Sequence, residues 1–489
     1  MITAFKSKIR KMNTKNTGFI DLPKELRSKF SKNQQVLVSI QRKNLTFYAK
    51  IKEQNHKGIY VPSDLVCKSK LLEGAFEISL KRINGFSTKV TSDGRIYLPK
   101  NIVQQVQLNK GEIVKVCAEI EGKTYGQYSV ICSREKEKTT EYSIAFDSAT
   151  IGKSGIFQLE DVVSRNKTTL NQEMKEILKD FNYAQLDNER LVVFYGNRVP
   201  IIINKNIQIE KLAYYLGCYF SDGTKRGNSW GIVASTFEQA NFFLEMHKSI
   251  VPDAFTLSEL SFSWDGEGKA PIKEITNAWL QKTGVNVENR IRVRNILSTL
   301  HSKRNEYGSL VIKEHRQLVL LYYNRLISAL MTRIFKGDKD SARNFLLGCF
   351  EGDGSPSSKT HGHIVLASSR DEHEILAKIA KVAEMSSKVF IEQQNRFYLR
   401  FHSLGLLSKF LIIGEQIFRY YPKRRKKFIE RLSNIGAARY ILGKSITSGW
   451  VKNELRDAGL LNKGYKLTKK GEEIRMLLIK TKNEVNQNG

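Results

Sequence analysis

Two acidic residues occupy the same place in two copies of one short motif. Residues 216–223 read LGCYFSDG and residues 347–354 read LGCFEGDG, so the aligned acids are Asp222 and Asp353. Two carboxylates held close together repel each other unless a cation lies between them. Oxygen ligands of this kind favour a hard divalent ion. The repeat therefore predicts a Mg²⁺ (or Mn²⁺) site with Asp222 and Asp353 as metal ligands and catalytic residues.

The residues before each acid predict a pair of packed helices. Apolar side chains precede each aspartate, and Gly217 and Gly348 lie about one and a half turns before it. Small residues let two helix backbones approach closely, so these glycines are predicted helix-packing residues. A single Asp-Gly after an apolar helix is usually an ordinary helix end. The duplication with the same spacing is what favours a catalytic role for the two acids. Glu351 lies beside the second acid, where it could assist the site or simply be solvated, and we expect it to be solvated.

The chain around the two motifs predicts two similar halves, residues 205–335 and 336–432. Each half has the order helix, DG turn, strand, helix, strand, helix, and its strands are rich in β-branched and aromatic residues. The predicted elements after each motif are strands 231–235 and 317–323 with helices 237–250 and 326–335, and strands 363–367 and 396–401 with helices 372–384 and 404–418.

Residues 1–165 contain a second, shorter repeat. GFIDLPKEL begins at residue 18, GIYVPSDL at 58 and GRIYLPKNI at 94, and a weaker copy, GIFQLEDVV, begins at 155 with Glu in place of Pro. Each copy predicts a turn, a short strand and a Pro-started helical turn, followed by a second strand. Units this small cannot bury an apolar face alone, so the four copies are expected to pair in small β-barrels.

Three further segments complete the organisation. Residues 166–204 are a predicted connector with a short helix and two apolar strands. A basic run, residues 423–427, is expected to contact phosphate. Residues 433–489 predict a small helical unit, with a helix over 447–460, a short strand, and Thr468 as the N-cap of a last helix.

Composition indicates a polyanionic partner. The chain has 80 Lys and Arg against 49 Asp and Glu, a net charge of +31, which attracts nucleic acid. The five cysteines form no CxxC pair, which argues against a disulfide framework or a cysteine zinc site. The charged start predicts no signal peptide, and no membrane span is expected. We therefore expect a cytoplasmic, nucleoid-associated protein.

The duplicated motif, residues 212–223 and 343–354, resembles that of LAGLIDADG homing endonucleases with two motifs in one chain. The resemblance implies an α+β fold, a duplicated αββαββα core with saddle-shaped antiparallel sheets. It implies a monomer with internal pseudo-twofold symmetry that binds double-stranded DNA. The last acid of each motif, Asp222 or Asp353, would bind Mg²⁺ for a staggered double-strand cut. Family members place a basic residue near each metal, for which Lys313, Arg396 and Arg400 are candidates.

Both flanking regions resemble DNA-binding modules. The repeat at residue 94 resembles the AbrB/SpoVT swapped-hairpin signature, and the tail resembles the end of a winged-helix domain. The predicted DNA-binding residues are Arg95, Lys100, Lys313, Arg396, Arg400, Lys423, Arg424, Arg425, Lys426 and Lys427.

Three functions are compatible with these resemblances. The main prediction is a site-specific, metal-dependent DNA endonuclease, favoured by the two intact acids. The alternative is a transcription regulator that keeps the scaffold without cutting, favoured by more DNA-binding modules than cleavage requires. RNA splicing by a maturase-like relative is a third possibility, supported only by basic charge and the resemblance. An intein is not expected, because the chain lacks the junction residues of one.

Overall fold

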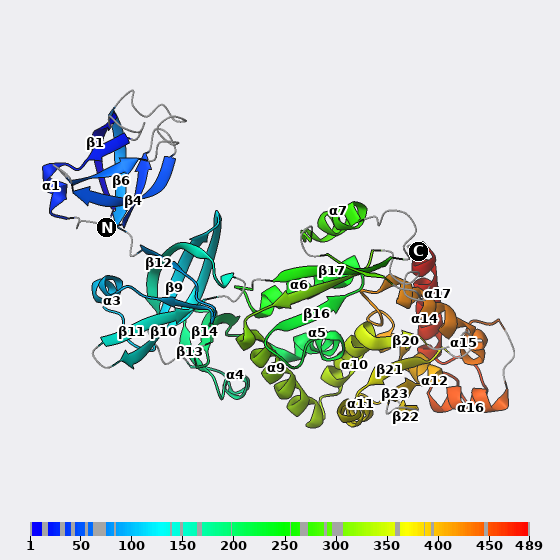
Figure 1. The fold of residues 1–489 in the computed structure, drawn as a ribbon. Coiled ribbons are helices and arrows are strands. Elements are labelled where there is room, and N and C mark those ends of the chain that lie inside the picture. The colour runs from blue at the N-terminus through cyan, green and yellow to red at the C-terminus, as the bar shows by residue number, and fades with distance from the viewer. Residues whose placement is uncertain are drawn as a thin grey trace. The chain divides into compact units, whose positions relative to one another are not determined.

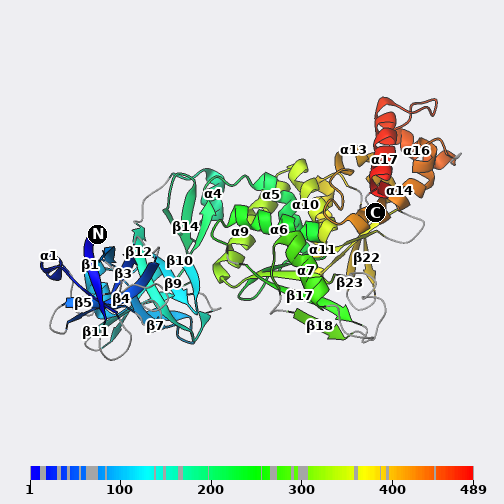
Figure 2. The same ribbon diagram turned by 90° about the horizontal axis from the view of Figure 1, so that it is seen from above.

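The computed structural model describes residues 2–11, 18–29, 35–40, 45–53, 57–61, 75–82, 85–136, 139–146, 150–163, 169–196, 198–254, 256–264, 272–287, 291–295, 307–356, 362–385, 387–392, 396–444 and 448–487. They form two compact units, Met1–Arg165 with Gly196–Pro200, and Asn166–Tyr195 with Ile201–Gly489 (Figures 1 and 2). The fold is mixed α+β with curled, largely antiparallel sheets, which confirms the expectation at that level.

The first unit consists of two β-structures, each with its own apolar core. A closed barrel has the strand order β1-β2-β5-β4-β3-β6, and a six-stranded sheet has the order β7-β12-β9-β10-β11-β8. The elements are β1 (Ile2–Lys11), β2 (Gly18–Asp21), α1 (Lys24–Arg27), β3 (Gln35–Ile40), β4 (Leu45–Glu53), β5 (Lys57–Val61), β6 (Ala75–Arg82), β7 (Gly85–Lys89), β8 (Arg95–Tyr97), α3 (Lys100–Val106), β9 (Ile113–Ile120), β10 (Lys123–Lys136), β11 (Thr139–Ala145) and β12 (Ser154–Val163).

Among the described residues, the short repeats take two forms in this unit. Pro23 precedes α1 and Pro99 precedes α3, so the predicted Pro-started helical turns are confirmed in these two copies. In the copy at residue 58, Pro62 lies outside the described residues. The fourth copy is the continuous strand β12, so a helical turn there was a wrong prediction. It lacks a proline to start a helix, and its β-branched valines favour extended backbone.

The second unit begins with α4 (Gln172–Ile177) and a sheet of β13 (Asn182–Gln185), β14 (Arg190–Phe194) and β15 (Ile201–Asn204). Two halves follow. The first contains α5 (Ile209–Asp222), β16 (Trp230–Ala234), α6 (Phe237–Ile250), β17 (Leu257–Trp264), α7 (Ile272–Thr283), β18 (Ile291–Asn295), β19 (Ser309–Glu314) and α9 (Gln317–Phe335). The second contains α10 (Lys339–Asp353), β20 (Gly354–Pro356), β21 (Ile364–Ser368), α11 (Arg370–Val382), β22 (Ser387–Glu392), β23 (Arg396–Phe401), α12 (Ser403–Ser408) and α13 (Phe410–Ile413).

The two halves share one topology. Their sheets have the orders β16-β19-β17-β18 and β20-β21-β23-β22. After the motif, Gly223 bridges to Ile232 of β16, as Gly354 pairs with Leu366 of β21. The register therefore makes β16 equivalent to β21, β19 to β23, and β17 to β22. The first half alone adds α7 and β18, and β18 pairs in parallel with β17 at the sheet edge.

Most predicted elements of the two halves are confirmed, with two exceptions. The strand expected at residues 317–323 is the first part of helix α9, and the strand that pairs with β16 is β19, just before it. Buried Leu318, Tyr322 and Leu326 recur at helical spacing, so burial on one helix face outweighs the strand preference of the tyrosines. The single helix expected at 404–418 is two short ones, α12 and α13, separated at Lys409.

Helix α9 is long and apolar enough to cross a membrane by length and composition, and it is the one such helix in the described part of the chain. It packs against α4, α5 and α10 within the second unit. Burial of this kind is typical of a core helix.

The chain ends in four helices, α14 (Pro422–Asn434), α15 (Gly436–Ile441), α16 (Gly449–Asp457) and α17 (Lys469–Gln487). Leu461 and Leu467 form an isolated antiparallel bridge between α16 and α17. The Thr468 hydroxyl accepts a hydrogen bond from the Gly471 amide at 3.1 Å, which is the N-cap interaction predicted for this residue.

Candidate functional site

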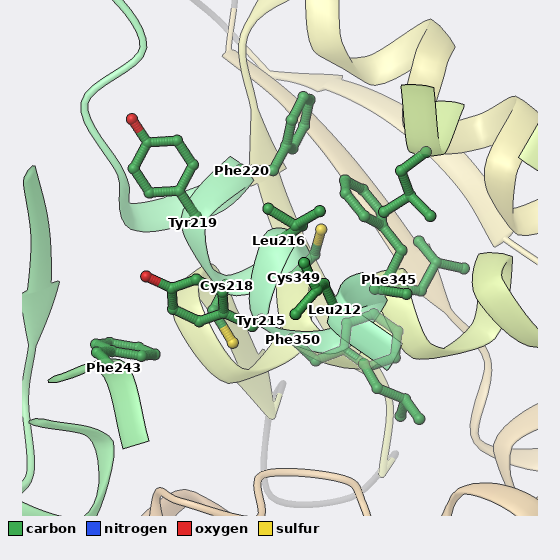
Figure 3. Packing of buried hydrophobic residues seen from close by; sticks show 14 of the residues in the cluster. Leu212, Tyr215, Leu216, Cys218, Tyr219, Phe220, Phe243, Phe345, Cys349 and Phe350 are labelled. Carbon is green, nitrogen blue, oxygen red and sulfur yellow. The ribbon is translucent and has the colours of Figure 1, made fainter. Parts of the chain in front are cut away.

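Helices α5 and α10 pack with their backbones in contact at the two motif glycines. A Cβ added to Gly217 would lie 2.9 Å from the Phe345 carbonyl carbon and 3.1 Å from Gly348 Cα. A Cβ added to Gly348 would overlap the Tyr214 carbonyl oxygen. Figure 3 shows Leu216, Cys218, Phe345 and Cys349 around this crossing, and all four are buried.

This packing brings the two motif acids to one end of the helix pair. Asp222 and Asp353 are the last residues of α5 and α10. Asp222 is half-buried and Asp353 is exposed. Loss of solvation, together with the charge of Asp353, raises the pKa of Asp222 to about 7. The pKa of Asp353 is also raised, chiefly by loss of solvation. The two carboxyls are therefore close enough to influence each other's ionisation.

Two cations of the protein lie beside these acids. The charges of Arg424 and Lys225 each lower the pKa of both aspartates, against the larger effect of desolvation. Arg424, in the first turn of α14, donates through Nη1 to the carbonyls of Glu351, at 3.1 Å, and Gly352. Lys225 pairs with the Glu372 carboxylate and lies 4.3 Å from the Phe220 ring centroid. The acid pair is thus partly neutralised from within the chain.

Glu351 is fully buried, so the expectation that it is solvated was wrong. Its Oε2 accepts from the Tyr214 hydroxyl at 2.8 Å, and its Oε1 accepts from the Gln239 amide at 3.1 Å. Burial raises the pKa of Glu351, and these hydrogen bonds oppose that shift. The carboxylate is tolerated inside the protein because partners on α5 and α6 satisfy it.

The third residues of helices α6 and α11 each contact a residue of the opposite half. Thr236 caps α6 and Ser369 caps α11, so Gln239 and Glu372 are both third residues of their helices. Gln239 of the first half contacts Glu351 of the second, and Glu372 of the second half contacts Lys225 of the first. Sequence analysis missed these contacts. The spacing of Thr236-x-x-Gln239 and Ser369-x-x-Glu372 is the signal that could have found them.

The residues present fit a divalent metal poorly. In the described part of the chain, no group of three or more His, Cys, Asp or Glu side chains is arranged to hold a metal ion. Glu351 is occupied by Tyr214 and Gln239, and a divalent cation at Asp222 and Asp353 would meet the charges of Arg424 and Lys225. The Mg²⁺ site stays a prediction.

Lys313 and Arg400 occupy equivalent positions on the central strands of the two sheets. Lys313 of β19 pairs with Gly231 of β16, one residue before the Ile232 bridge, and Arg400 of β23 pairs with Val365 of β21, one residue before Leu366. Their strand neighbours Ile312 and Leu399 are buried in the core. Alternation along a strand therefore puts Lys313 and Arg400 on the sheet faces that point away from helices α5 and α10.

The other predicted DNA-binding residues are dispersed. Arg95 lies on β8 beside Asp93, and Lys100 is an exposed residue at the start of α3. Arg396 is the first residue of β23. In the basic run, Lys423 and Lys427 are exposed, and Lys426 is half-buried. Arg425 donates to the Glu415 and Ile417 carbonyls at 3.0 Å, and burial lowers the pKa of its guanidinium. Arg424 and Arg425 thus bond to the protein itself.

Comparison with known proteins corrects the family assignment. No protein-family model and no curated protein matches this chain. A solved structure to which it is similar is the "Crystal structure of full-length DUF199/WhiA from Thermatoga maritima", at 16% identity over 58% of this chain and 94% of that one, with a TM-score of 0.25. A likeness at that TM-score carries no argument about function. The assignment to the LAGLIDADG homing endonucleases, with AbrB/SpoVT and winged-helix modules, was therefore wrong: no family model supports it, and the solved structure found is a different protein.

Proposed function

We propose that this chain is a sequence-specific, double-stranded DNA-binding regulator that does not cleave, built on a duplicated core of LAGLIDADG-type topology. The observation that carries the proposal is the equivalence of Lys313 and Arg400. One cation stands at the same register position on the outward face of each half's central strand. A duplicated surface with duplicated cations suits a partner that itself repeats, as the major groove of a duplex does from one helical turn to the next.

The charge of the chain supports this choice of partner. A net charge of +31 attracts a polyanion along the whole molecule. The major groove of B-DNA is wide enough to admit antiparallel strands, and side chains on them can then reach base edges. Arginine and lysine donate to guanine there, and they also neutralise phosphates.

The state of the two motif acids supports binding without cleavage. Loss of solvation and the charge of Asp353 oppose ionisation of the Asp222 carboxyl, and a carboxyl binds a metal only when it is ionised. Arg424 and Lys225 supply the positive charge that a metal would otherwise supply. In this proposal the acids belong to the packing of the two halves.

Replacing Arg400 with glutamine is expected to weaken binding to a selected duplex roughly 5- to 150-fold, because a guanidinium that contacts a base or phosphate is worth about 1–3 kcal/mol. The test is fluorescence anisotropy with a labelled duplex selected from a randomised pool. Lys336→Gln, which removes an exposed cation at the end of α9, is the matched control and should change affinity less than twofold.

Three results would count against the proposal. The first is no duplex binding by the wild-type chain even at low salt, where counterion release favours association most. The second is an equal loss of affinity in Arg400→Gln and Lys336→Gln. The third concerns cleavage: the bound duplex should stay intact after incubation with Mg²⁺ or Mn²⁺, and a staggered cut would contradict the non-cleaving role.

A further inference from the structure

An acidic residue lies next to Lys313 on the outward face of the first sheet. Lys313 Nζ lies 2.8 Å from Glu259 Oε2, and both side chains are a little over a quarter exposed. The buried residues Leu260 of β17 and Leu310 and Ile312 of β19 alternate with them. Glu259 and Lys313 therefore belong to the face that the proposed function turns toward DNA.

The equivalent place in the second half has a different set of residues. Lys313 pairs in register with Leu257 of β17, whereas Arg400 pairs with Lys388 of β22. Two residues further along, Glu259 pairs with Val311, and Phe390 pairs with Tyr398. Phe390 thus holds the register position of Glu259. The first half therefore has an acid where the second half has an aromatic residue, and the second half has a second cation, Lys388, where the first half has Leu257.

An acid on a phosphate-binding face lowers affinity for every DNA sequence, because it repels the backbone charge. Such an acid can instead contribute to sequence specificity if it contacts a base edge. In the major groove, glutamate accepts a hydrogen bond from the N4 amino group of cytosine, and lysine donates to O6 and N7 of guanine. One G·C pair presents both groups side by side. An ammonium has three donors, so Lys313 can keep its bond to Glu259 while it contacts guanine.

We infer that Glu259 is a specificity-determining residue, and that the Glu259–Lys313 pair reads one G·C base pair in the half of the DNA site that the first sheet contacts. The inference rests on the proposed function, since it concerns the same DNA-facing surface. The second sheet has Arg400 at the position of Lys313 and Phe390 at the position of Glu259, so it has no acid at that position. The DNA site is then asymmetric at this position.

The test is selection of bound duplexes from a randomised pool, followed by affinity measurements over a salt series, with the full-length chain. Glu259→Gln is compared with the wild type and with Glu238→Gln, which removes an exposed acid from helix α6 and changes net charge equally. In Glu259→Gln, preference for G·C at one position of one half-site should fall roughly 5- to 150-fold. Affinity for unrelated duplex should rise, with a steeper salt dependence. Glu238→Gln should leave the base preference unchanged.

Lys313→Gln provides the second arm. It should relax preference at the same base pair, and the double variant should lose no more preference than either single one, because the two side chains act as a unit. A uniform gain of affinity in Glu259→Gln with the G·C preference intact would overturn the inference and leave the proposed function standing. Failure of the proposed function itself would appear separately, as absence of duplex binding by the wild type. Coincident urea unfolding curves for wild type and Glu259→Gln confirm that both are folded.

Discussion

Gly348→Ala is expected to lower the free energy of unfolding of the second unit by about 3 kcal/mol or more. The added Cβ would overlap the Tyr214 carbonyl oxygen and lie 2.8 Å from the Cys218 amide nitrogen. These are backbone atoms of α5, so no side-chain rotation relieves the clash, and the helices must separate. Separation would also loosen the buried side chains around the crossing, such as Phe345 and Cys349.

Urea denaturation followed by far-ultraviolet circular dichroism measures this change. Gly217→Ala should behave like Gly348→Ala, since its Cβ would meet the backbone of Phe345 and Gly348. Gly449→Ala is the matched control: it lies in the first turn of α16, and a Cβ there meets nothing within 4 Å. We expect the control to be neutral or slightly stabilising, because alanine favours helix. A Gly348→Ala midpoint equal to that of the control would show that α5 and α10 do not touch there.

The duplicated motif explains how much of the core the sequence could predict. Helices and strands close to each motif, such as α6 and β16, have strong local patterns and were located correctly. The strand assigned to residues 317–323 failed because a buried helix and a buried strand both appear as a continuous apolar run. The pair α7 and β18 in the first half alone interrupted the expected spacing, which hid β19.

The surroundings of the acids were harder to predict than the acids themselves. Gln239 and Arg424 lie well outside both motifs, and Lys225, although only three residues after Asp222, has no local feature that indicates its partner. Gln239 meets Glu351 and Lys225 meets Glu372 because the two halves pack together, and Arg424 reaches the carbonyls of Glu351 and Gly352 from α14. Contacts between halves depend on tertiary packing, for which a single sequence carries no local signal. The prediction that Glu351 is solvated was wrong for the same reason.

The state of the acid pair predicts an unusual response to pH. Asp222 has a pKa of about 7 in the folded chain, against an ordinary value of 3.8. Below pH 3.8 the carboxyl is protonated in both the folded and the unfolded states, so it does not change the free energy of unfolding. As pH rises toward 7, the unfolded state releases the proton while the folded state retains it, so stability falls. Above 7 the folded chain carries the full cost of a poorly solvated carboxylate beside Asp353.

Asp222→Asn removes that cost, so it is expected to raise the free energy of unfolding at pH 8 by about 2 kcal/mol and to change it little at pH 4. The rise in the pKa of Asp222 corresponds to a loss of at most about 4 kcal/mol in the free energy of unfolding. Partial solvent access and the neighbouring cations reduce this loss. Urea unfolding of both proteins at pH 4, 6 and 8 measures it. Asp353→Asn should give a smaller gain of the same sign, because it removes one of the charges that raise the pKa of Asp222.

Repeating the pH 8 measurement with Mg²⁺ distinguishes a metal site at the two acids from an acid pair that is neutralised by Arg424 and Lys225. An ion held by Asp222 and Asp353 would bind the folded state alone and stabilise the wild type, which would then equal or exceed Asp222→Asn. If instead Arg424 and Lys225 are the partners of these acids, Mg²⁺ leaves the gap between the two proteins unchanged. We expect the second result, because Arg424 and Lys225 already lie beside both carboxylates and would repel a further cation.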